Sequence, residues 1–338
     1  MTGTKKLLPK TNKAGFYEIR MESIGGLGAN LAGKVLAEAG VLGMGLNGVN
    51  FASYGSEKKG TPVKSFVRFS EPDLEIRSNS PVEEPHILVI FHEKMIKTYV
   101  LTQGVGEDGI VIVNTSKTPD EIRDDLRLRA GTVVCVDAIR IAVEEKVKLN
   151  TTLLGTIASA SGFIDKTALK GAISATFKKK YPHLIDANIR AFERGYSEFS
   201  VKTFKPDDNE YEYVPFNRSV PDLGYENAPI GGVILNPGNS VHKDLSASRT
   251  GHIPLFIKDK CTNCGECEIT CPDYCFVWEI GVDKHGKQKR ILLGIDYQFC
   301  KGCMKCVEIC KFDALKKELE SSHDVGAITV KHREFALK

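Results

Sequence analysis

The chain has 338 residues, which leaves room for about two or three domains with cores of their own. Its 46 Lys and Arg residues nearly balance 43 Asp and Glu residues, and no basic run is interleaved with aromatic residues, so nucleic-acid binding is not expected. No apolar stretch reaches the roughly 18 to 20 residues that span a bilayer, and the first residues lack an apolar signal core. We therefore expect a cytoplasmic protein without a membrane partner, in a reducing compartment where thiolates survive.

Near the N-terminus, alternating apolar residues predict a strand over residues 16–24. A glycine turn at 25–28 then leads into a helix over 29–39, and such a helix N-terminus can bind an anion. Two nucleotide fingerprints nearly fit here, and both fail. Leu31 stands where the dinucleotide pattern needs glycine, and Val35 stands where a phosphate loop needs Ser or Thr. A tight turn that packs glycines is therefore preferred over a nucleotide site.

Short apolar strands alternate with helical patterns over the next part of the chain, as far as residue 199. This alternation predicts an α/β domain with a mainly parallel sheet and helices on both faces. Cys135 lies inside a Val-rich strand and is expected in the core, while Asp137 just after it either caps a helix or faces a ligand at the carboxyl edge of the sheet. Strands are predicted at 46–53, 63–69, 87–91, 109–114 and 132–137, and helices at 94–102, 119–128 and within 150–199.

Two segments carry little periodicity. The loop 54–62 contains Glu57, Lys58 and Lys59 and is either a solvated hairpin tip or an interaction loop. Residues 201–252 hold several prolines and a Gly-Gly pair, and we expect a linker that wraps over neighbouring surfaces.

Nine of the ten cysteines lie between Cys261 and Cys310. The first run has the spacing C-x2-C-x2-C-x3-C-P, which holds a [4Fe–4S] cluster, and all four cysteines recur 39 residues later. In two-cluster modules of this type the fourth cysteine of each run ligates the other cluster. A disulfide framework or structural zinc fits less well, because the spacing is duplicated and no secretory signal is seen. We predict two [4Fe–4S] clusters, one on Cys261, Cys264, Cys267 and Cys310 and the other on Cys300, Cys303, Cys306 and Cys271.

The ninth cysteine of this stretch, Cys275, falls outside the repeated spacing. Its counterpart 39 residues later is Ala314, so Cys275 is expected to be a packing thiol and not a ligand. Between the two runs, residues 276–295 predict a hairpin with Gly286 at its turn, and Trp278 is expected to pack on the module. Four thiolates per cluster leave no open site on iron, so the predicted chemistry is electron storage and relay.

The domain organisation follows from these patterns. The cysteine module is expected to be an α+β domain of the bacterial 2[4Fe–4S] ferredoxin type, and residues 327–330 of the C-terminal tail could add an edge strand. The predicted boundaries are an N-terminal arm at 1–15, the α/β domain at 16–200, the linker at 201–252, the ferredoxin-type domain at 253–320 and a C-terminal tail at 321–338.

These motifs resemble those of one family. In the α/β domain, the runs at 24–28 (IGGLG), 54–60 (YGSEKKG) and 150–155 (NTTLLG) resemble the gamma subunit of 2-oxoacid:ferredoxin oxidoreductases, the pyruvate:ferredoxin oxidoreductase family. The runs at 236–240 and 244–251, followed by the cysteine module, are similar to the delta subunit. Together the two resemblances cover nearly the whole chain and imply fused gamma and delta subunits.

The resemblance implies a subunit and not a complete enzyme. Family members decarboxylate a 2-oxoacid on thiamine diphosphate, pass the electrons through [4Fe–4S] clusters to ferredoxin, and usually release an acyl-CoA. This sequence has no Gly-Asp-Gly run with a downstream Asn-Asn pair, so thiamine diphosphate and Mg²⁺ are expected on partner alpha and beta subunits. The chain itself would relay electrons to external ferredoxin, with its α/β domain near the approach of coenzyme A.

Two alternatives stay open at this point. One is a free-standing ferredoxin-type carrier fused to a ligand-binding α/β domain, and the other is a flavin- or dinucleotide-dependent oxidoreductase. Residues 258–318 contain eleven Lys or Arg against ten Asp or Glu. A diffusing ferredoxin is generally strongly acidic, which steers it to its partners. The near-neutral module therefore favours one that is built into a complex.

Overall fold

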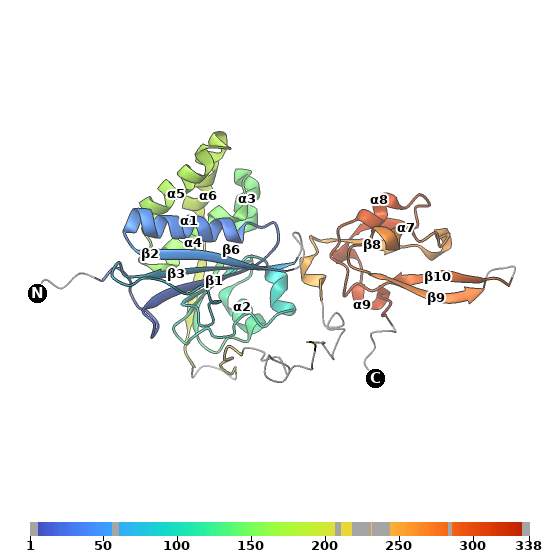
Figure 1. The fold of residues 1–338 in the computed structure, drawn as a ribbon, viewed down its shortest axis with the longest axis horizontal. Helices are drawn as coiled ribbons and strands as arrows, with labels where there is room; N and C mark the ends of the chain where they lie inside the picture. The colour runs from blue at the N-terminus through green and yellow to red at the C-terminus, as the bar shows by residue number, and fades with distance from the viewer. Residues whose placement is uncertain are drawn as a thin grey trace, which may run out of the picture. The chain divides into compact units, whose positions relative to one another are not determined.

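The computed structural model describes residues 6–55, 61–206, 211–217, 231, 244–282 and 286–332. The chain forms two compact units, Met1–Arg218 and Ser219–Lys338 (Figure 1). The predicted loop at 54–62 lies partly outside the described residues, and the run at 236–240 lies wholly outside them.

The first unit is a seven-stranded sheet with helices on both faces, so the predicted α/β class is confirmed. In the strand order β2-β3-β1-β4-β5-β6-β7, the strands β1, β4, β5 and β6 pair in parallel and the outer pairings are antiparallel. The strands are β1 (Phe16–Ile24), β2 (Asn47–Tyr54), β3 (Pro62–Ser70), β4 (Ile87–Ile90), β5 (Ile110–Asn114), β6 (Gly131–Val136) and β7 (Ser200–Phe204). The helices are α1 (Ala29–Glu38), α2 (Pro119–Leu126), α3 (Ala138–Glu145), α4 (Leu149–Ser161), α5 (Lys166–Lys178) and α6 (Ile185–Ser197).

The two faces of this sheet are covered differently. Figure 1 shows α1, α3, α4, α5 and α6 gathered on one face and α2 on the other. Ile19 and Met21 of β1 are fully buried in the core that these strands form with α1 and α4. Because side chains alternate along a strand, Arg20 between them faces the opposite side.

Arg20 contacts a segment whose predicted structure is wrong. Its Nη2 donates hydrogen bonds to the carbonyls of Leu101 (2.8 Å) and Gln103 (2.7 Å). Carbonyls two residues apart lie on opposite sides of a helix, but here both point at one guanidinium. In place of the helix predicted at 94–102 the chain forms a 3₁₀ helix at Glu93–Lys97 followed by turns.

Two glycines allow α4 and α6 to pack closely. A Cβ added at Gly155 would meet the backbone oxygen of Phe192, and one added at Gly195 would meet the backbone of α4. Across the same contact, Thr156 Oγ1 donates to the Gly195 carbonyl at 2.8 Å. The run at 150–155 therefore serves close helix packing.

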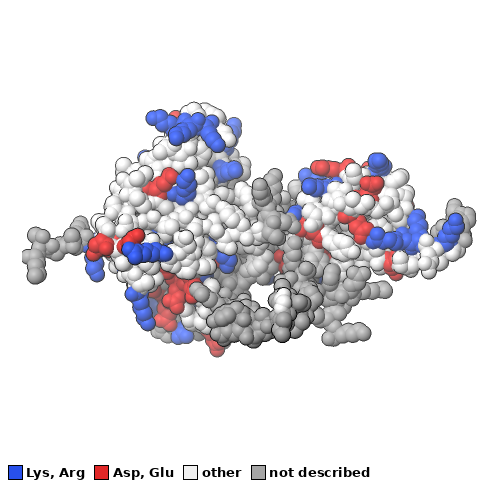
Figure 2. Space-filling model, viewed as in Figure 1, with Lys and Arg blue, Asp and Glu red and all other residues white. Residues whose placement is uncertain are grey.

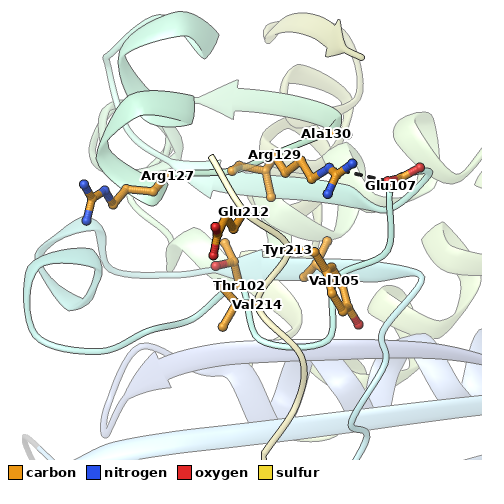
Figure 3. A pocket seen from close by; sticks show the side chains of 10 residues that line it. Thr102, Val105, Glu107, Arg127, Arg129, Ala130, Glu212, Tyr213 and Val214 are labelled. Carbon is orange, nitrogen blue, oxygen red and sulfur yellow. Dashed lines mark ion pairs between the residues drawn. The ribbon is translucent and has the colours of Figure 1, made fainter. Parts of the chain in front are cut away.

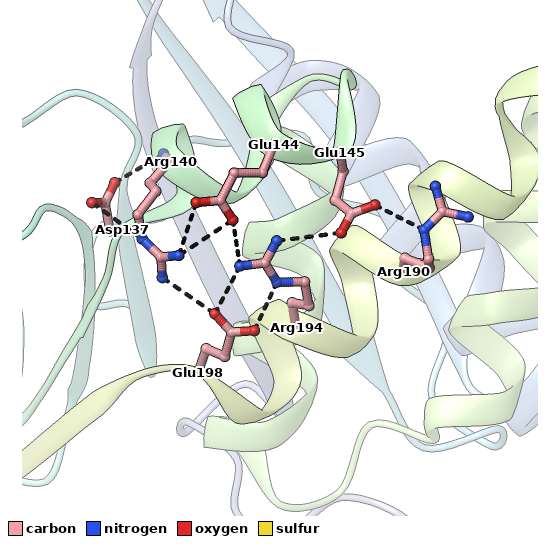
Figure 4. Close-up of polar contacts among 7 residues, drawn as sticks. All are labelled: Asp137, Arg140, Glu144, Glu145, Arg190, Arg194 and Glu198. Carbon is pink, nitrogen blue, oxygen red and sulfur yellow. Dashed lines mark hydrogen bonds and ion pairs between the residues drawn. The ribbon is translucent and has the colours of Figure 1, made fainter.

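Ion pairs connect α3 and α6 at the surface (Figure 4). The guanidinium of Arg194 in α6 pairs with Glu144 (2.6 Å) and Glu145 (3.3 Å) of α3. It also pairs with Glu198 one turn farther on (2.7 Å), and Arg140 of α3 reaches the same carboxylate at 3.2 Å. Hydrogen bonds from Arg194 lower the pKa of Glu144 and of Glu198, so both carboxylates stay charged in this network.

The sheet extends past the point where the sequence predicts a linker. Residues 201–204 belong to β7, which pairs antiparallel with β6. Only Phe204 of this strand is buried, so its apolar pattern is weak. Farther on, the segment 211–217 is tied to the first unit, because the Gly104 amide donates to the Val214 carbonyl at 2.9 Å. Residues 211–217 therefore contact the first unit, and the wrapping linker at 201–252 stays a prediction.

The second unit contains two two-stranded sheets and several short helices. β9 pairs with β10, so the predicted hairpin is confirmed. The edge strand predicted at 327–330 is wrong, because Asp324 accepts a hydrogen bond from the Ala327 amide at 3.2 Å and caps a short helix instead. The elements are β8 (His252–Phe256), α7 (Glu266–Thr270), β9 (Phe276–Val282), β10 (Gln288–Ile295), α8 (Lys305–Ile309), β11 (Leu315–Leu319) and α9 (Val325–Ile328).

Charged side chains of both signs occur on the surface of each unit. Figure 2 shows Lys and Arg side chains gathered near the end of α5 and along the β9–β10 hairpin, while both signs are mixed elsewhere on this face. Among the described residues, no helix has the length and apolar character needed to cross a membrane.

Candidate metal centres

The two cysteine runs fold into the same local structure. Each forms a loop and then a short helix, α7 in the first run and α8 in the second. The duplication of the sequence is therefore matched by a duplication of the backbone. Left-handed backbone recurs at three pairs of positions 39 residues apart, Asn263 and Gly302 (φ +60° and +69°), Gly265 and Met304 (+84° and +62°), and Tyr274 and Asp313 (+53° and +51°).

The first cavity of this unit has three cysteines of the first run and the last cysteine of the second on its wall. Cys264 is exposed and Cys267 is buried, so one end of this group faces water. Apolar side chains form much of the remaining wall, namely Phe256, Trp278, Leu292, Phe312 and Leu315. The four cysteines are Cys261, Cys264, Cys267 and Cys310.

The second cavity repeats this arrangement with the runs exchanged. Its wall carries Cys300, Cys303, Cys306 and Cys271. Positions 275 and 276 line this cavity, and the positions 39 residues later, 314 and 315, line the first cavity in the same way. The structure brings the eight cysteines together in the two sets of four named from the sequence, and their role as iron ligands stays a prediction.

Both cavities fit a thiolate-bound group larger than a single ion. In the described part of the chain no three His, Cys, Asp or Glu side chains converge as they would around one metal ion, and the sulfurs are spread over the cavity walls. Backbone amides also point at sulfurs. The Asn263 amide donates to Cys261 Sγ at 3.4 Å, and the Gly302 amide donates to the Cys300 sulfur. Such N–H···S bonds stabilise thiolates and tune iron–sulfur clusters.

Cys275 is a ninth sulfur at the second cavity. It is 3% exposed, as expected of a packing thiol. Hydrogen bonds to Cys271 and Cys300, together with burial, raise the pKa of Cys275. The same bond from Cys275 lowers the pKa of Cys271 to about 6 and also lowers that of Cys300. Cys275 is therefore a buried sulfur that lies beside two cysteines of the second set.

Two cations near the second cavity, the buried Arg249 and the partly buried Lys301, were not identified from the sequence. Arg249 Nη1 donates to the carbonyl of Cys300 at 3.1 Å. Lys301 pairs with Asp273 at 3.1 Å, and the Asp273 side chain is only 2% exposed. The sequence offers one signal for Arg249, its place in the delta-like run at 244–251, but that run does not indicate what it contacts.

Two glycines, one at the turn of the first unit and one in the helix after it, serve close packing. Gly28 has φ +88°, and a Cβ there would lie 3.1 Å from the side chain of Asn150. A Cβ at Gly33 would meet Ser65 of β3, so α1 lies directly on the sheet. Asp137 accepts from the Arg140 amide at 3.0 Å and caps α3, which decides between the two interpretations of this residue.

Cys135 is buried in β6, as predicted for a core thiol. Burial raises its pKa to about 12, with smaller contributions from Glu93 and Glu121.

A shallow pocket of about 280 Å³ lies beside the segment 212–214 (Figure 3). Its polar side chains include Arg129, which pairs with Glu107 at 3.6 Å. The pocket lies where β5 and β6 begin, whereas ligands of open α/β sheets bind at the carboxyl ends of the strands. We therefore assign it to the packing of the 211–217 segment.

Comparison with known proteins accounts for both units. The family model described as pyruvate ferredoxin/flavodoxin oxidoreductase matches residues 18–198, more than half of the chain. The chain belongs to this family. A second model, described as a 4Fe-4S dicluster domain, matches residues 260–324 and includes both cysteine runs. The chain is thus a gamma-type subunit of this oxidoreductase family with a 4Fe–4S domain attached.

Relatives match the first unit. Pyruvate synthase subunit PorC of Thermotoga maritima is 36% identical over 186 residues, which are 54% of this chain and 94% of that protein. The common subunit gamma of the pyruvate/ketoisovalerate oxidoreductases of Pyrococcus abyssi is also 36% identical, over 54% of this chain and 97% of that protein. The crystal structure of pyruvate oxidoreductase subunit PORC from Thermotoga maritima is 32% identical, covers 56% of this chain and 99% of that chain, and gives a TM-score of 0.49.

Proposed function

We propose that this chain is the electron-transfer subunit, a fused gamma and delta subunit, of a cytoplasmic thiamine-diphosphate-dependent 2-oxoacid:ferredoxin oxidoreductase. In this proposal residues 16–200 form the gamma-type domain, 201–252 the linker, and 253–320 the 2[4Fe–4S] ferredoxin-type domain, between an arm at 1–15 and a tail at 321–338. Membership of the oxidoreductase family and the attached 4Fe–4S domain support this assignment.

The observation that carries the proposal is the exchange of cysteines between the two cavities. One cavity would hold a [4Fe–4S] cluster on Cys261, Cys264, Cys267 and Cys310, and the other on Cys271, Cys300, Cys303 and Cys306. Bound clusters supply one-electron storage without an open site for substrate. Around them the chain provides the thiolates, the amide donors to sulfur, and apolar walls that limit the access of water.

The carbon chemistry is assigned to partner chains. We infer that alpha and beta subunits bind thiamine diphosphate and Mg²⁺, because this chain lacks the Gly-Asp-Gly and Asn-Asn signature. The gamma-type domain would dock on those subunits near the approach of coenzyme A, and external ferredoxin would take the electrons. Cys264 and Cys303 are the exposed cysteines of the two sets, and we infer that electrons leave the domain near them.

Reconstitution tests this assignment. Partner subunits that bind thiamine diphosphate are mixed with and without this chain, and reduction of ferredoxin or a viologen dye is followed with a panel of 2-oxoacids. We expect reduction only when the chain is present, and none by the chain alone. Equal dye reduction without the chain, or thiamine-independent turnover by the chain alone, would contradict the proposal.

A further inference from the structure

We propose that the two clusters of this chain differ in reduction potential, and that the Cys275 thiol raises the potential of the cluster on Cys271, Cys300, Cys303 and Cys306. The inference rests on the proposed function, since it requires that both cavities hold clusters. Cys275 acts here as a tuning residue and not as a ligand.

The internal duplication provides a matched comparison. Position 275 lines the second cavity and position 314 lines the first. Both residues are 3% exposed. Their backbones are held in the same way, since the Cys275 carbonyl accepts from the Asp296 amide and the Ala314 carbonyl from the Ile257 amide, each at 2.8 Å. The difference between the two positions is therefore a thiol in place of a methyl hydrogen.

This thiol has hydrogen-bonding partners in the ligand set. Cys275 lines the same cavity as Cys271 and Cys300 and forms side-chain hydrogen bonds to both. These two cysteines come from different runs, so a single S–H group lies against both halves of the set. Ala314 has no side-chain donor to offer the first cavity.

A donor at this place favours the reduced state. Reduction adds one electron to the cluster and its thiolates, and hydrogen bonds to the sulfurs stabilise the added negative charge. The S–H bond stays intact, and no proton is transferred. Because the thiol is buried, water competes weakly with this bond, and its electrostatic effect is larger than at a surface.

Charged neighbours act in the same direction. Lys305 lines the second cavity at the position where Glu266 lines the first. Both side chains are exposed, so solvent screens much of this difference. Lys301 is balanced by Asp273 at 3.1 Å, and this pair adds little net charge. An electron that enters the domain would therefore rest on the second cluster and pass through the first.

The test is an anaerobic redox titration of the full chain, followed by EPR spectroscopy. Iron and sulfide analysis comes first and should give about eight of each per chain. The wild type should then show two one-electron midpoints. We expect Cys275→Ala to lower the higher midpoint potential by about 59 mV. For a one-electron couple this corresponds to about a tenfold fall in the reduced-to-oxidised ratio of that cluster at a fixed solution potential. The lower midpoint should not move.

Two further variants separate hydrogen bonding from packing. Cys275→Ser keeps a hydrogen-bond donor in a smaller group, so it should lower the higher midpoint by less than Cys275→Ala does. Ala314→Cys places the thiol in the first cavity and should raise the lower midpoint, which narrows the gap between the two.

The outcomes distinguish the two proposals. Midpoints that are unchanged in Cys275→Ala at full iron content, or a shift of the lower midpoint alone, would overturn the role of this thiol. An unchanged gap in Ala314→Cys at full iron content would do the same. A wild-type chain that binds no pair of clusters would instead overturn the proposed function, before any midpoint is compared.

Discussion

Arg249 Nη1 lies 3.1 Å from the backbone carbonyl oxygen of Cys300, the first cysteine of the second run. The same guanidinium donates to the Tyr297 carbonyl at 2.8 Å and pairs through Nε with Glu320 at 2.9 Å. Arg249 is only 5% exposed, so these bonds are made away from water. One side chain therefore connects the segment before β8, the second cysteine loop and the end of β11.

We expect Arg249→Ala to loosen the second cysteine loop. Hydrogen bonds to charged groups contribute about 1.5 to 3 kcal/mol each to folding stability, and breaking a buried ion pair costs about 3 to 5 kcal/mol. We therefore expect the free energy of unfolding of this domain to fall by about 3 kcal/mol or more. The measurement is the rate at which visible cluster absorbance bleaches in urea. Arg290→Ala is the control, because that guanidinium is 53% exposed where it pairs with Glu268. Equal bleaching rates in the two variants would show that Arg249 does not hold the loop.

Truncation of single cysteines should separate ligands from spare thiols. Cys264→Ala and Cys303→Ala remove exposed side chains, so they cost little packing, yet each should lose about four of eight iron atoms. Cys135→Ala and Cys275→Ala remove buried thiols and should keep the full iron content. Iron and acid-labile sulfide per chain are the quantities to measure. Zinc in comparable amounts, or loss of iron from Cys275→Ala, would contradict the ligand sets.

The α4–α6 contact offers a test of close packing. Gly155→Ala would place a Cβ against the Phe192 carbonyl, and overpacking of this kind costs about 1 to 3 kcal/mol. Gly171→Ala is the control, because its Cβ would meet nothing within 4 Å on the exposed side of α5. There alanine should stabilise the helix by about 0.5 to 1 kcal/mol. Urea unfolding followed by far-UV circular dichroism should show shifts of opposite sign, and shifts of the same sign would refute the packing argument.

Much of the fold could be predicted from the sequence because the pattern and the packing agree. Buried strands such as β5 are continuous apolar runs, and the cysteine spacing fixes the duplicated module by itself. The predictions failed where a tertiary contact decides the local structure. The segment 94–102 has a helical pattern, but the chain forms a 3₁₀ helix only as far as Lys97, and the Leu101 carbonyl accepts a hydrogen bond from Arg20 instead. Strand β7 was missed because only Phe204 in it is buried.

At the candidate metal centres, too, the sequence pattern predicts one part of the structure and tertiary contacts decide the rest. The two sets of cysteines could be named from spacing, since the repeat of 39 residues carries the topology. The charged residues that contact the second cysteine loop could not be named from the sequence. Arg249 is separated by 51 residues from the carbonyl it binds, and the pairing of Lys301 with Asp273 brings together residues from different runs. No periodicity indicates such contacts, because each depends on how the two halves of the module pack.

His86 gives a pH dependence that belongs to the first unit. Its ring stacks on Tyr17 with centroids 4.5 Å apart, and its Nδ1 accepts a hydrogen bond from the Glu18 amide at 3.0 Å. Burial, and next the charge of Lys10, lower the pKa of His86 from its ordinary 6.5 to about 4, while Asp108 opposes this shift. Because the folded pKa is the lower one, the unfolded chain binds the proton first as the pH falls. Stability should therefore decrease between about pH 6.5 and pH 4.

The test compares urea unfolding of the wild type and His86→Asn at about pH 7.5 and about pH 4.5. Asparagine keeps an acceptor for the Glu18 amide but does not titrate and does not stack, so the variant should be less stable near neutral pH. The wild type should lose about 2.5 kcal/mol more than the variant on going to the lower pH, since each pKa unit corresponds to about 1.36 kcal/mol. Carboxylates that titrate in both proteins cancel in this difference. His183→Asn, at an exposed position, should follow the wild type. Parallel pH profiles for the wild type and His86→Asn would mean that the imidazole is not held neutral by the fold.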